Sequence, residues 1–202
     1  MPRAFYDRGA EVVARELLGA VLVRRTQKDT LRARIVETEA YVGQHDLACH
    51  AARGLTERTA VMFGPPGRAY VYLVYGMHDM LNVVTAGEGD PQAVLIRACE
   101  PNSGDAERAG GAVERMDGPG RLTKALLVTR DLNGHDLNRP PLWIEAGSPP
   151  PRVEVGPRVG VDYAAEWADA PLRFFDADSQ AVSRSRSRRL SSERAGPKAN
   201  LT

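Results

Sequence analysis

Apolar and polar positions along this chain repeat with two periods, and each period predicts a different kind of element. Residues 11–18, EVVARELL, carry apolar side chains at helical spacing and are followed by a glycine, which predicts a helix that ends there. Other short runs are apolar or alternate strictly, as is typical of strands: residues 20–25, 31–40, 69–75, 80–85, 93–99 and 142–146. Short polar turns join several of these runs, so we expect antiparallel hairpins.

The segments between these strands complete the predicted architecture. Residues 43–60 are polar and loop-like, and the glycine-rich residues 102–111 are expected to be exposed. Residues 117–128, DGPGRLTKALLV, predict a glycine loop that opens a helix, and residues 158–175 predict two short strands around a helical turn. Strands in sequential hairpins with a few helices favour an α+β fold with an antiparallel sheet. A length of 202 residues favours one domain.

The strand LRARIVETEAY, residues 31–41, changes character along its length. Strict alternation places six side chains on one face: Leu31, Ala33, Ile35, Glu37, Glu39 and Tyr41. The face that begins apolar therefore ends with two carboxylates and a tyrosine. Two interpretations remain open at this point. The strand emerges into solvent with two ordinary surface acids, or it carries one carboxylate to a pocket floor as a general base.

Tyrosines concentrate in the stretch AYVYLVYGMHDMLNVV, residues 69–84. Three of the six tyrosines of the chain, Tyr70, Tyr72 and Tyr75, fall within six residues, and the run breaks at Gly76. A structural interpretation is aromatic packing on a sheet. A functional interpretation is a platform for a flat ligand such as a nucleobase.

The segment QHDLACHAARG contains His45, Cys49 and His50, which raises the question of a metal site. Their spacing matches no strong zinc pattern, and no second Cys/His pair completes a tetrahedral site, so we predict no metal. His50 is expected either to hydrogen-bond or stack in a pocket, or to be a structural loop histidine.

Composition and charge narrow the class of protein. An apolar content of 43% and a charged content of 26% are ordinary for a soluble globular protein. No apolar run approaches the roughly 20 residues of a membrane helix, and the N-terminus has no signal-peptide core. We therefore expect a cytoplasmic protein that is not secreted and has no membrane partner. Cys49 and Cys99 are expected to be buried, reduced side chains.

The net charge of +1 conceals an uneven distribution. Residues 184–202 carry six basic side chains and one acidic side chain, a net charge of +5, which leaves −4 for residues 1–183. We predict a folded domain over residues 1–182 and a basic, disordered tail over residues 183–202. The tail either adds non-specific affinity for phosphate groups or is merely a soluble terminus.

Taken together, motifs in a fixed order resemble the alkyladenine (3-methyladenine) DNA glycosylase family. They span about residues 5–175 and are FYDRGAEVVARELLG, RIVETEAYVG, RTAVMFGPPGRAYVYLVYGMHDMLNVV, AVLIRACEP, DGPGRLTKAL and RVGVDYAAEWADAPLRF. The resemblance implies a single domain with a curved antiparallel sheet, surrounding helices and a protruding hairpin. It also implies a base-excision-repair enzyme that flips a damaged purine out of double-stranded DNA and hydrolyses its N-glycosidic bond.

The resemblance further implies the properties of that enzyme. The expected lesions are 3-methyladenine, 7-methylguanine, hypoxanthine and ethenoadenine. We expect a monofunctional enzyme that uses no cofactor, leaves an abasic site, acts as a monomer and associates with the nucleoid.

The resemblance also assigns roles to individual positions. Glu39 matches the catalytic carboxylate, and Arg97 and the main-chain carbonyl of Val159 match groups that place the attacking water. The pocket for the flipped base is assigned to Tyr41, His50, Tyr72, Asn82 and Leu95, with Asn82 excluding guanine. Intercalation into the duplex is assigned to Tyr75, supported by Met77. Contacts with the DNA backbone are expected from Arg58, Arg68, Gly118, Gly120, Arg121 and Lys124.

Competing interpretations accompany these assignments. Tyr70 is expected to be a core residue, and Lys124 has an alternative role as a solvated helix charge. A similarity of fold to the C-terminal domain of formyltransferases acting on tRNA suggests a non-catalytic nucleic-acid-binding module as an alternative function. A metal hydrolase that uses His45 and His50 is a more distant alternative.

Overall fold

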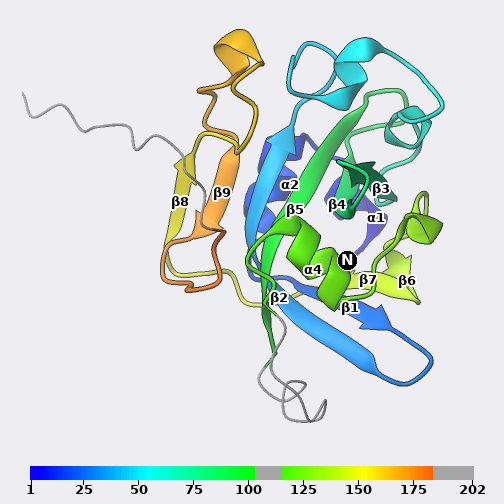
Figure 1. The fold of residues 1–202 in the computed structure, drawn as a ribbon, viewed down its shortest axis with the longest axis vertical. Helices are drawn as coiled ribbons and strands as arrows, with labels where there is room; N and C mark the ends of the chain where they lie inside the picture. The colour runs from blue at the N-terminus through cyan, green and yellow to red at the C-terminus, as the bar shows by residue number, and fades with distance from the viewer. Residues whose placement is uncertain (103–114, 184–202) are drawn as a thin grey trace, which may run out of the picture.

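The computed structural model describes residues 1–102 and 115–183. Within them the chain forms one curled antiparallel sheet with a few short helices (Figure 1), which confirms the predicted α+β fold. The predicted exposed segment after Asn102 and the predicted basic tail from residue 184 lie outside the described residues. No helix in the described part is long and apolar enough to cross a membrane.

The sheet contains nine strands in this part of the chain, and their neighbours run antiparallel. Their bounds are β1 Val21–Arg25, β2 Thr30–Tyr41, β3 Ala69–Val74, β4 His78–Thr85, β5 Gln92–Pro101, β6 Asn138–Arg139, β7 Leu142–Glu145, β8 Val153–Gly156 and β9 Arg173–Asp176. The main order is β3-β4-β5-β2-β1-β7-β6, with β9 paired to β2 and to β8. The strands predicted up to residue 146 are present within a few residues of their expected ends.

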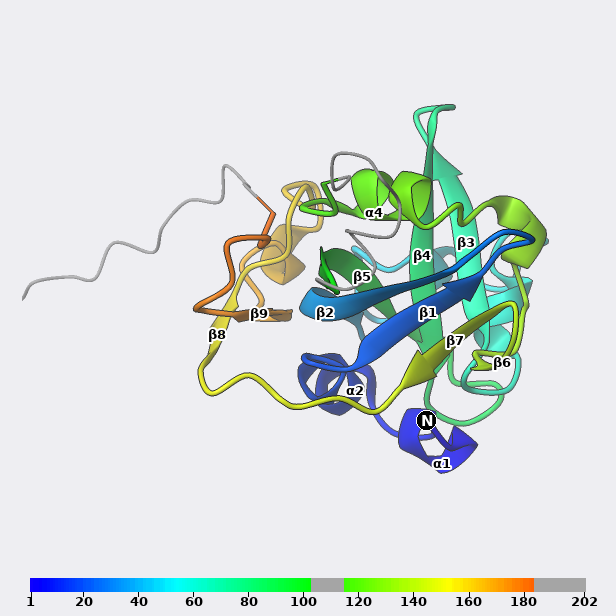
Figure 2. The ribbon, with the colours of Figure 1, turned by 90° about the horizontal axis from the view of Figure 1, so that it is seen from below.

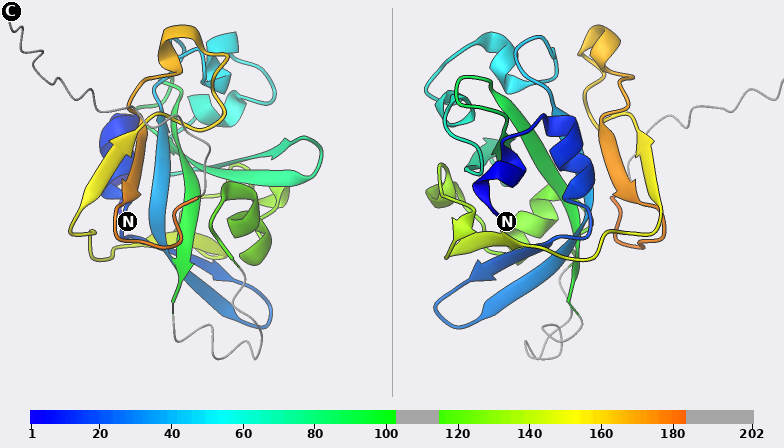
Figure 3. Two further views of the ribbon diagram at one scale, coloured as in Figure 1. Left: turned by 60° about the vertical axis from the view of Figure 1, so that its left-hand side comes forward. Right: turned by 180° about the vertical axis from the view of Figure 1, so that it is seen from behind.

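The helices are short. Their bounds are α1 Arg3–Tyr6, α2 Ala10–Glu16 and α4 Pro119–Ala125, with 3-10 helices η1 His50–Arg53, η2 Ala60–Phe63, η3 Arg130–Leu132 and η4 Ala165–Trp167. Helix α2 packs against β2 and β5, whereas α4 packs against β4 and β5. Figures 1 and 3 show α2 and α4 on opposite sides of β5. Figure 2 shows α1 beside α2, away from α4.

The main hydrophobic core is built from the apolar stripe of α2 and the sheet. Val13, Ala14 and Leu17 of the helix region are fully buried against strand residues such as Ile35 and Ile96. Full burial of a large aliphatic side chain stabilises a fold by roughly 1.5–3 kcal/mol. The helix predicted over residues 11–18 is thus present, although its regular part ends at Glu16.

Strand β2 changes its outer neighbour half-way along its length. It pairs with β1 over Thr30–Arg34 and with β9 over Glu37–Glu39. On its other side it follows β5, with register shifts between Ile35 and Glu37 and between Glu37 and Thr38. The ladder is therefore irregular at the point where β9 replaces β1, as at a β-bulge.

Because of this irregularity, the prediction that alternate side chains of β2 share one face along its whole length is wrong. Ala33 and Ile35 pack in the main core, but so does Ala40, which strict alternation places on the opposite face. Tyr41 packs instead against two smaller clusters on the other side of the sheet. A shift of one residue moves every later side chain to the other face, which alternation alone does not reveal. Glu37 is fully buried, as is Glu39, so their interpretation as surface acids is wrong.

Strands β3 and β4 form the predicted hairpin, which protrudes from the molecule (Figures 2 and 3). The Met77 N–H donates to the Val74 carbonyl at 3.1 Å and closes the turn. Tyr75 and Gly76 between them have φ of 51° and 70°. Two successive positive φ angles are the geometry of a type I′ turn, whose twist matches that of the strands. Gly76 adopts such an angle without steric cost, whereas Tyr75 does not.

The C-terminal part differs from the prediction. The first strand lies at Val153–Gly156, and the predicted strand from Arg158 is a turn in which Gly160 has φ of 76°. The second predicted strand is β9, and η4 is the helical turn between them.

Both cysteines, Cys49 and Cys99, are buried and unbridged, as expected.

Candidate active site

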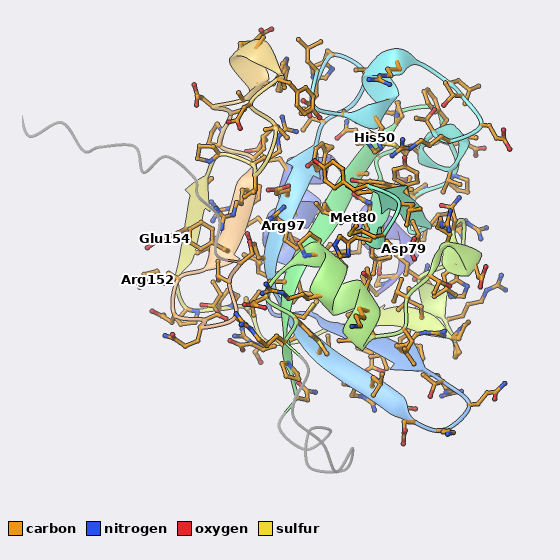
Figure 4. All side chains as sticks on the ribbon, viewed as in Figure 1. His50, Asp79, Met80, Arg97, Arg152 and Glu154 are labelled. Atoms are coloured by element: carbon orange, nitrogen blue, oxygen red, sulfur yellow. The ribbon has the colours of Figure 1, made fainter. Side chains whose placement is uncertain are left out.

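A pocket of about 290 Å³ opens between the β3–β4 hairpin, β5 and two loops. This volume is near the lower end for small-ligand sites, about 300–1,000 Å³. The predicted site residues that line it are Tyr41, His50, Tyr72, Tyr75, Asn82, Leu95, Arg97 and Val159. Figure 4 shows three of the lining residues, His50, Met80 and Arg97, which come from η1, β4 and β5. The fold thus brings together residues that are far apart in the sequence.

Glu39 lies fully buried on β2, in contact with three residues that line the pocket. Its Oε1 accepts a hydrogen bond from the Val159 backbone N–H at 2.7 Å and lies 3.4 Å from Arg97 Nη1. Its Oε2 accepts a hydrogen bond from the Tyr41 hydroxyl at 3.0 Å. A buried carboxylate is tolerated when it has such partners. A carboxylate oxygen has two lone pairs, so Oε2 retains capacity for a further donor.

Arg97 connects Glu39 to a second buried carboxylate. Its Nε donates to Glu37 Oε1 at 3.1 Å, and its Nη2 donates to the Ser183 hydroxyl at 3.3 Å. Burial lowers the pKa of Arg97, but the carboxylates of Glu39 and Glu37 outweigh this and leave the pKa above its usual value. The guanidinium is therefore a fixed cation between two acids.

Tyr41 forms one aromatic wall of the pocket and rests on a buried ion pair. The Arg158 guanidinium lies 4.8 Å from the centre of the Tyr41 ring. It donates to Asp46 with both terminal nitrogens, at 2.8 Å from Nη2 to Oδ1, and to the Ala40 carbonyl at 3.0 Å. Burial, followed by the charge of Glu39, raises the pKa of Tyr41 well above its usual value. The phenol therefore stays protonated and donates to Glu39.

Tyr72 forms the other aromatic wall. Its ring lies 4.5 Å from the His50 ring at an interplanar angle of 69°, and the Arg58 guanidinium lies 5.1 Å from its centre. His50 Nδ1 is 2.9 Å from the Tyr70 hydroxyl. Tyr70 is buried in a small cluster, as predicted, but it also orients His50 and lines the pocket.

His50 is neutral at physiological pH because of its surroundings. Burial, followed by the charges of Arg58 and Arg53, lowers its pKa to about 4. A neutral imidazole has one donor and one acceptor nitrogen. With Nδ1 engaged by Tyr70, the ring presents Nε2 as its remaining polar atom.

Asn82 lies deep in the pocket and is held by the neighbouring strand. Its Nδ2 donates to the Tyr70 carbonyl at 3.1 Å, and the residue is buried. It pairs across the sheet with Leu95, which is also buried and lines the pocket. These two positions are therefore fixed by the sheet.

The tip of the hairpin carries two exposed apolar side chains. Tyr75 is 90% exposed and Met77 is 71% exposed. Tyr163, in the loop before η4, is 71% exposed and lines the pocket as Tyr75 does. Among the described residues, Tyr75 and Tyr163 are the exposed aromatic side chains. Sequence reasoning assigned no role to Tyr163.

The predicted backbone-contacting cations have different surroundings. Arg58 and Lys124 are exposed. Arg121 is exposed but pairs with Asp117 at 2.7 Å. Arg68 donates to the Gly134 carbonyl at 3.2 Å and does not belong to the pocket lining.

The predicted glycines flank the start of α4. Gly118 precedes the helix with open space around it. A Cβ at Gly120 would lie 3.0 Å from Cγ of the His78 ring. The absence of a side chain at Gly120 is therefore explained by the close packing of α4 on β4.

Sequence reasoning missed several residues that shape this site. Glu37 belongs to the same ETEAY motif as Glu39 but received no role of its own. Asp46 and Arg158 are a buried pair behind Tyr41, and no local pattern connects them. Ser183, placed in the predicted tail, is buried and bonded to Glu37. Over residues 1–102 and 115–183, no three His, Cys, Asp or Glu side chains gather as a potential metal site.

Known proteins are similar to this chain over most of its length. A family model described as Methylpurine-DNA glycosylase (MPG) matches residues 4–180. A protein of Myxococcus xanthus is 55% identical over 186 residues, which cover 91% of this chain and 93% of that protein. Proteins of Methanocella arvoryzae and Legionella pneumophila (strain Lens) are 49% and 48% identical, covering 91% of this chain and 96% and 98% of theirs. All three are provisionally named 3-methyladenine DNA glycosylases.

Proposed function

The chain belongs to the methylpurine-DNA glycosylase family, and on this premise we propose that it is a monofunctional glycosylase for damaged purines in double-stranded DNA. The proposed lesions are alkylated or deaminated purines: 3-methyladenine, 7-methylguanine, hypoxanthine and ethenoadenine. The proposed reaction hydrolyses the N-glycosidic bond and leaves an abasic site. The enzyme is proposed to act as a cytoplasmic, nucleoid-associated monomer without a cofactor.

One observation carries this proposal. A fully buried carboxylate, Glu39, is bonded to residues that line a pocket with tyrosine walls, and an exposed tyrosine borders the same pocket. A module that only binds nucleic acid has no need of a buried acid at the pocket. An enzyme that extrudes a base and hydrolyses its glycosidic bond has a use for all three: the acid for hydrolysis, the walls for the flipped base and the exposed side chain for the gap in the duplex.

Glu39 is proposed to act as the general base. Cleavage of a glycosidic bond passes through a transition state that resembles an oxocarbenium ion. A carboxylate beside C1′ accepts a proton from the attacking water and stabilises the developing positive charge. Arg97 and the Val159 carbonyl are proposed to place that water. An alkylated purine is already cationic, so it leaves without further protonation.

The monofunctional character is proposed on the composition of the pocket. No lysine is among the described residues that line it. A lyase that cuts the DNA strand after removing the base uses an amine nucleophile to form a Schiff base. Water is therefore the proposed nucleophile, and the product is an intact strand with an abasic site.

The flipped base is proposed to lie between Tyr41 and Tyr72 with His50 at its edge. Stacking of a base on an aromatic ring contributes about 1–3 kcal/mol and accepts any purine. Discrimination then requires exclusion of normal bases. Asn82 is proposed to exclude guanine because its amide would clash with the exocyclic amine at the purine 2-position. Leu95 is proposed to complete the pocket wall.

Tyr75 is proposed to fill the gap that the extruded base leaves in the duplex, supported by Met77. Unstacking a base step costs a few kcal/mol, which an inserted side chain partly offsets. Arg58, Arg121 and Lys124, together with the main chain at Gly118 and Gly120, are proposed to contact DNA phosphates. Arg68 is proposed as a more distant contact. Such contacts position the duplex without reading its sequence.

The decisive test follows one labelled strand of a duplex with a single hypoxanthine or 3-methyladenine. Wild type, Glu39→Gln and the control Glu100→Gln are compared with and without alkali after the reaction. We expect strand breaks only after alkali. The excision rate of Glu39→Gln should fall by about 10²–10⁴-fold, as for loss of a general base, while its affinity for the lesion persists.

Each arm of this test has a defined meaning. Breaks without alkali would contradict the monofunctional assignment. Retained turnover by Glu39→Gln would contradict its role as base. Tight binding of both lesions without any breaks in wild type would favour the nucleic-acid-binding module. Loss of activity in excess EDTA would favour a metal hydrolase, whereas we expect full activity.

A further inference from the structure

Glu37 is a second buried acid close to the proposed base, and both of its carboxylate oxygens accept hydrogen bonds. Its Oε1 accepts hydrogen bonds from Arg97 Nε at 3.1 Å, from Arg173 Nε at 2.6 Å and from the Ser183 hydroxyl at 2.9 Å. Its Oε2 accepts from the Ser183 backbone N–H at 2.7 Å. Neither Glu37 nor Glu39 lines the pocket itself, but Glu39 contacts three lining residues, whereas in the described part of the chain Glu37 contacts only one of them, Arg97.

Ser183 completes this arrangement from the other end of the chain. Its hydroxyl donates to Glu37 Oε1 and accepts a hydrogen bond from Arg97 Nη2 at 3.3 Å. One hydroxyl supplies one donor and also accepts, so both capacities are used. The pair Glu37 and Ser183 therefore holds two of the three nitrogens of the Arg97 guanidinium.

The third nitrogen of Arg97 faces the proposed base. Nη1 lies 3.4 Å from Glu39 Oε1, whereas the bond from Nε to Glu37 is 3.1 Å. The longer distance exceeds the usual range of N–H···O bonds, which is about 2.7–3.2 Å. Arg97 is thus hydrogen-bonded to Glu37 and Ser183, whereas its contact with Glu39 is a longer ion pair.

We propose that Glu37 and Ser183 are positioning residues that hold Arg97 back from Glu39. In this arrangement Arg97 stabilises the Glu39 carboxylate from a distance but does not form a close bidentate pair with it. Glu39 consequently stays outside a close ion pair, and its carboxylate is available to accept a proton from water. This inference rests on the proposed function, because it concerns the same carboxylate.

The physical reason is competition for one cation. An opposite charge near a carboxylate lowers its pKa by about 1–3 units when the contact is close. Without the charge of Glu37, Arg97 has Glu39 as its remaining acidic partner. Arg97 and Glu39 would then form a close ion pair, which makes the Glu39 carboxylate a weaker base. Loss of the negative charge of Glu37 also makes Glu39 a weaker base, because a like charge nearby no longer opposes its ionised form.

Other charged and titratable groups also lie around the two acids. Those that face Glu39, besides Arg97 and Glu37, are Tyr41 on β2, Tyr72 on β3 and Arg158 in the loop after β8, and Arg158 is held by Asp46. Arg173 on β9 pairs with Glu37, so Glu37→Gln also removes the partner of that cation. Ser183→Ala leaves the pair of Arg173 and Glu37 intact, so a shift that both variants show is attributable to the sharing of Arg97.

The experiment measures single-turnover excision from a hypoxanthine duplex between pH 4.5 and pH 8. The variants are Glu37→Gln, Ser183→Ala, Ser183→Thr and the matched control Glu100→Gln. Glu100 lies on β5 and, like Glu37, accepts hydrogen bonds from an arginine and a serine: one from Arg34 Nη2 at 2.7 Å and one from the Ser179 hydroxyl. Folding of each variant is checked by circular dichroism.

We expect Glu37→Gln to lower the rate at pH 7 about tenfold and to move the acidic midpoint down by about one pH unit. Ser183→Ala should move it in the same direction by less, Ser183→Thr should restore it, and Glu100→Gln should match wild type. A folded Glu37→Gln with the wild-type midpoint overturns the inference. If Glu37→Gln does not fold, an unchanged midpoint in Ser183→Ala overturns it. Absence of excision by wild type would instead overturn the proposed function.

Discussion

At the scale of single residues, His50 shows how neighbours decide a protonation state. The ring is largely buried between Tyr70 and Tyr72, and Arg58 and Arg53 lie close enough to oppose a further positive charge. Its pKa of about 4 means that the unfolded chain, with an ordinary value near 6.5, binds the proton more readily than the folded protein does. A neutral ring suits the proposed role of this pocket, which is to receive purine bases of different charge.

This protonation difference predicts a pH dependence of stability. The contribution of His50 is fully present above about pH 6.5 and is lost as the pH falls toward about 4. His50→Gln removes this component, so its free energy of unfolding should fall less than that of wild type between pH 7 and pH 5. Urea unfolding of both proteins at the two pH values measures the difference. An equal fall in both proteins would show that His50 is not the group responsible.

At the scale of elements, the β3–β4 hairpin combines an exposed side chain with a costly backbone conformation. Tyr75 has φ of 51°, a region that costs roughly 1–2 kcal/mol for residues with a Cβ. Glycine at this position would relieve the strain and preserve the turn. A tyrosine that is 90% exposed gains little from burial in the protein. Its retention therefore agrees with a role in contact with DNA.

Tyr75→Gly separates the effect of backbone strain on stability from the effect of the tyrosine side chain on DNA binding. We expect the free energy of unfolding to change by less than about 1 kcal/mol, because relief of strain offsets the added freedom of the unfolded chain. Affinity for a lesion duplex should fall by about tenfold, or about 1.4 kcal/mol, which lies within the range of about 1–3 kcal/mol for a lost stacking contact. Fluorescence of an ethenoadenine in the duplex reports the flipped base.

Leu127→Gly is the matched control for this variant. Leu127 also has φ of 51° and is 57% exposed, but it does not line the pocket. The control should keep the lesion affinity of wild type. If Tyr75→Gly also keeps it, Tyr75 is not the intercalating residue.

At the scale of the whole molecule, charge is separated along the chain. Residues 1–183 carry a net charge of −4, so attraction of this part to DNA depends on local groups such as the proposed phosphate contacts Arg58 and Lys124. The net charge of +5 in residues 184–202 is concentrated in a short segment, so this segment as a whole attracts DNA. Non-specific affinity for DNA is governed by contacts between cations and phosphates and falls with added salt.

Removal of residues 184–202 therefore tests what the tail contributes. The slope of log affinity against log salt concentration should become shallower by about 0.9 for each tail cation that contacts a phosphate. A chain of full length with the six basic tail residues replaced by glutamine should behave like the deletion. An unchanged slope in both proteins would mean that the tail does not touch DNA. Excision from a bound lesion should be the same in all three.

Much of this architecture is predictable from the sequence, and the failures have physical reasons. The strands, the hairpin and the residues of the pocket follow from short-range patterns and from the motif resemblance. The face of β2 does not, because a bulge near Val36 is invisible to alternation. The bond between Glu37 and Ser183 joins residues 146 positions apart, and no local signal marks it. The buried pair of Asp46 and Arg158 is a tertiary contact of the same kind.

Strand β2 pairs first with β1 and then with β9, and this determines when the site can form during synthesis. The groups that hold Glu39 and Glu37 from outside β2 include the Val159 N–H, β9 and Ser183, which leave the ribosome well after β2 does. A nascent chain that has already formed the β3–β4 hairpin therefore still lacks part of the shell around its carboxylate. Catalytic competence should arise late in synthesis, when the C-terminal strand is laid beside residues made long before.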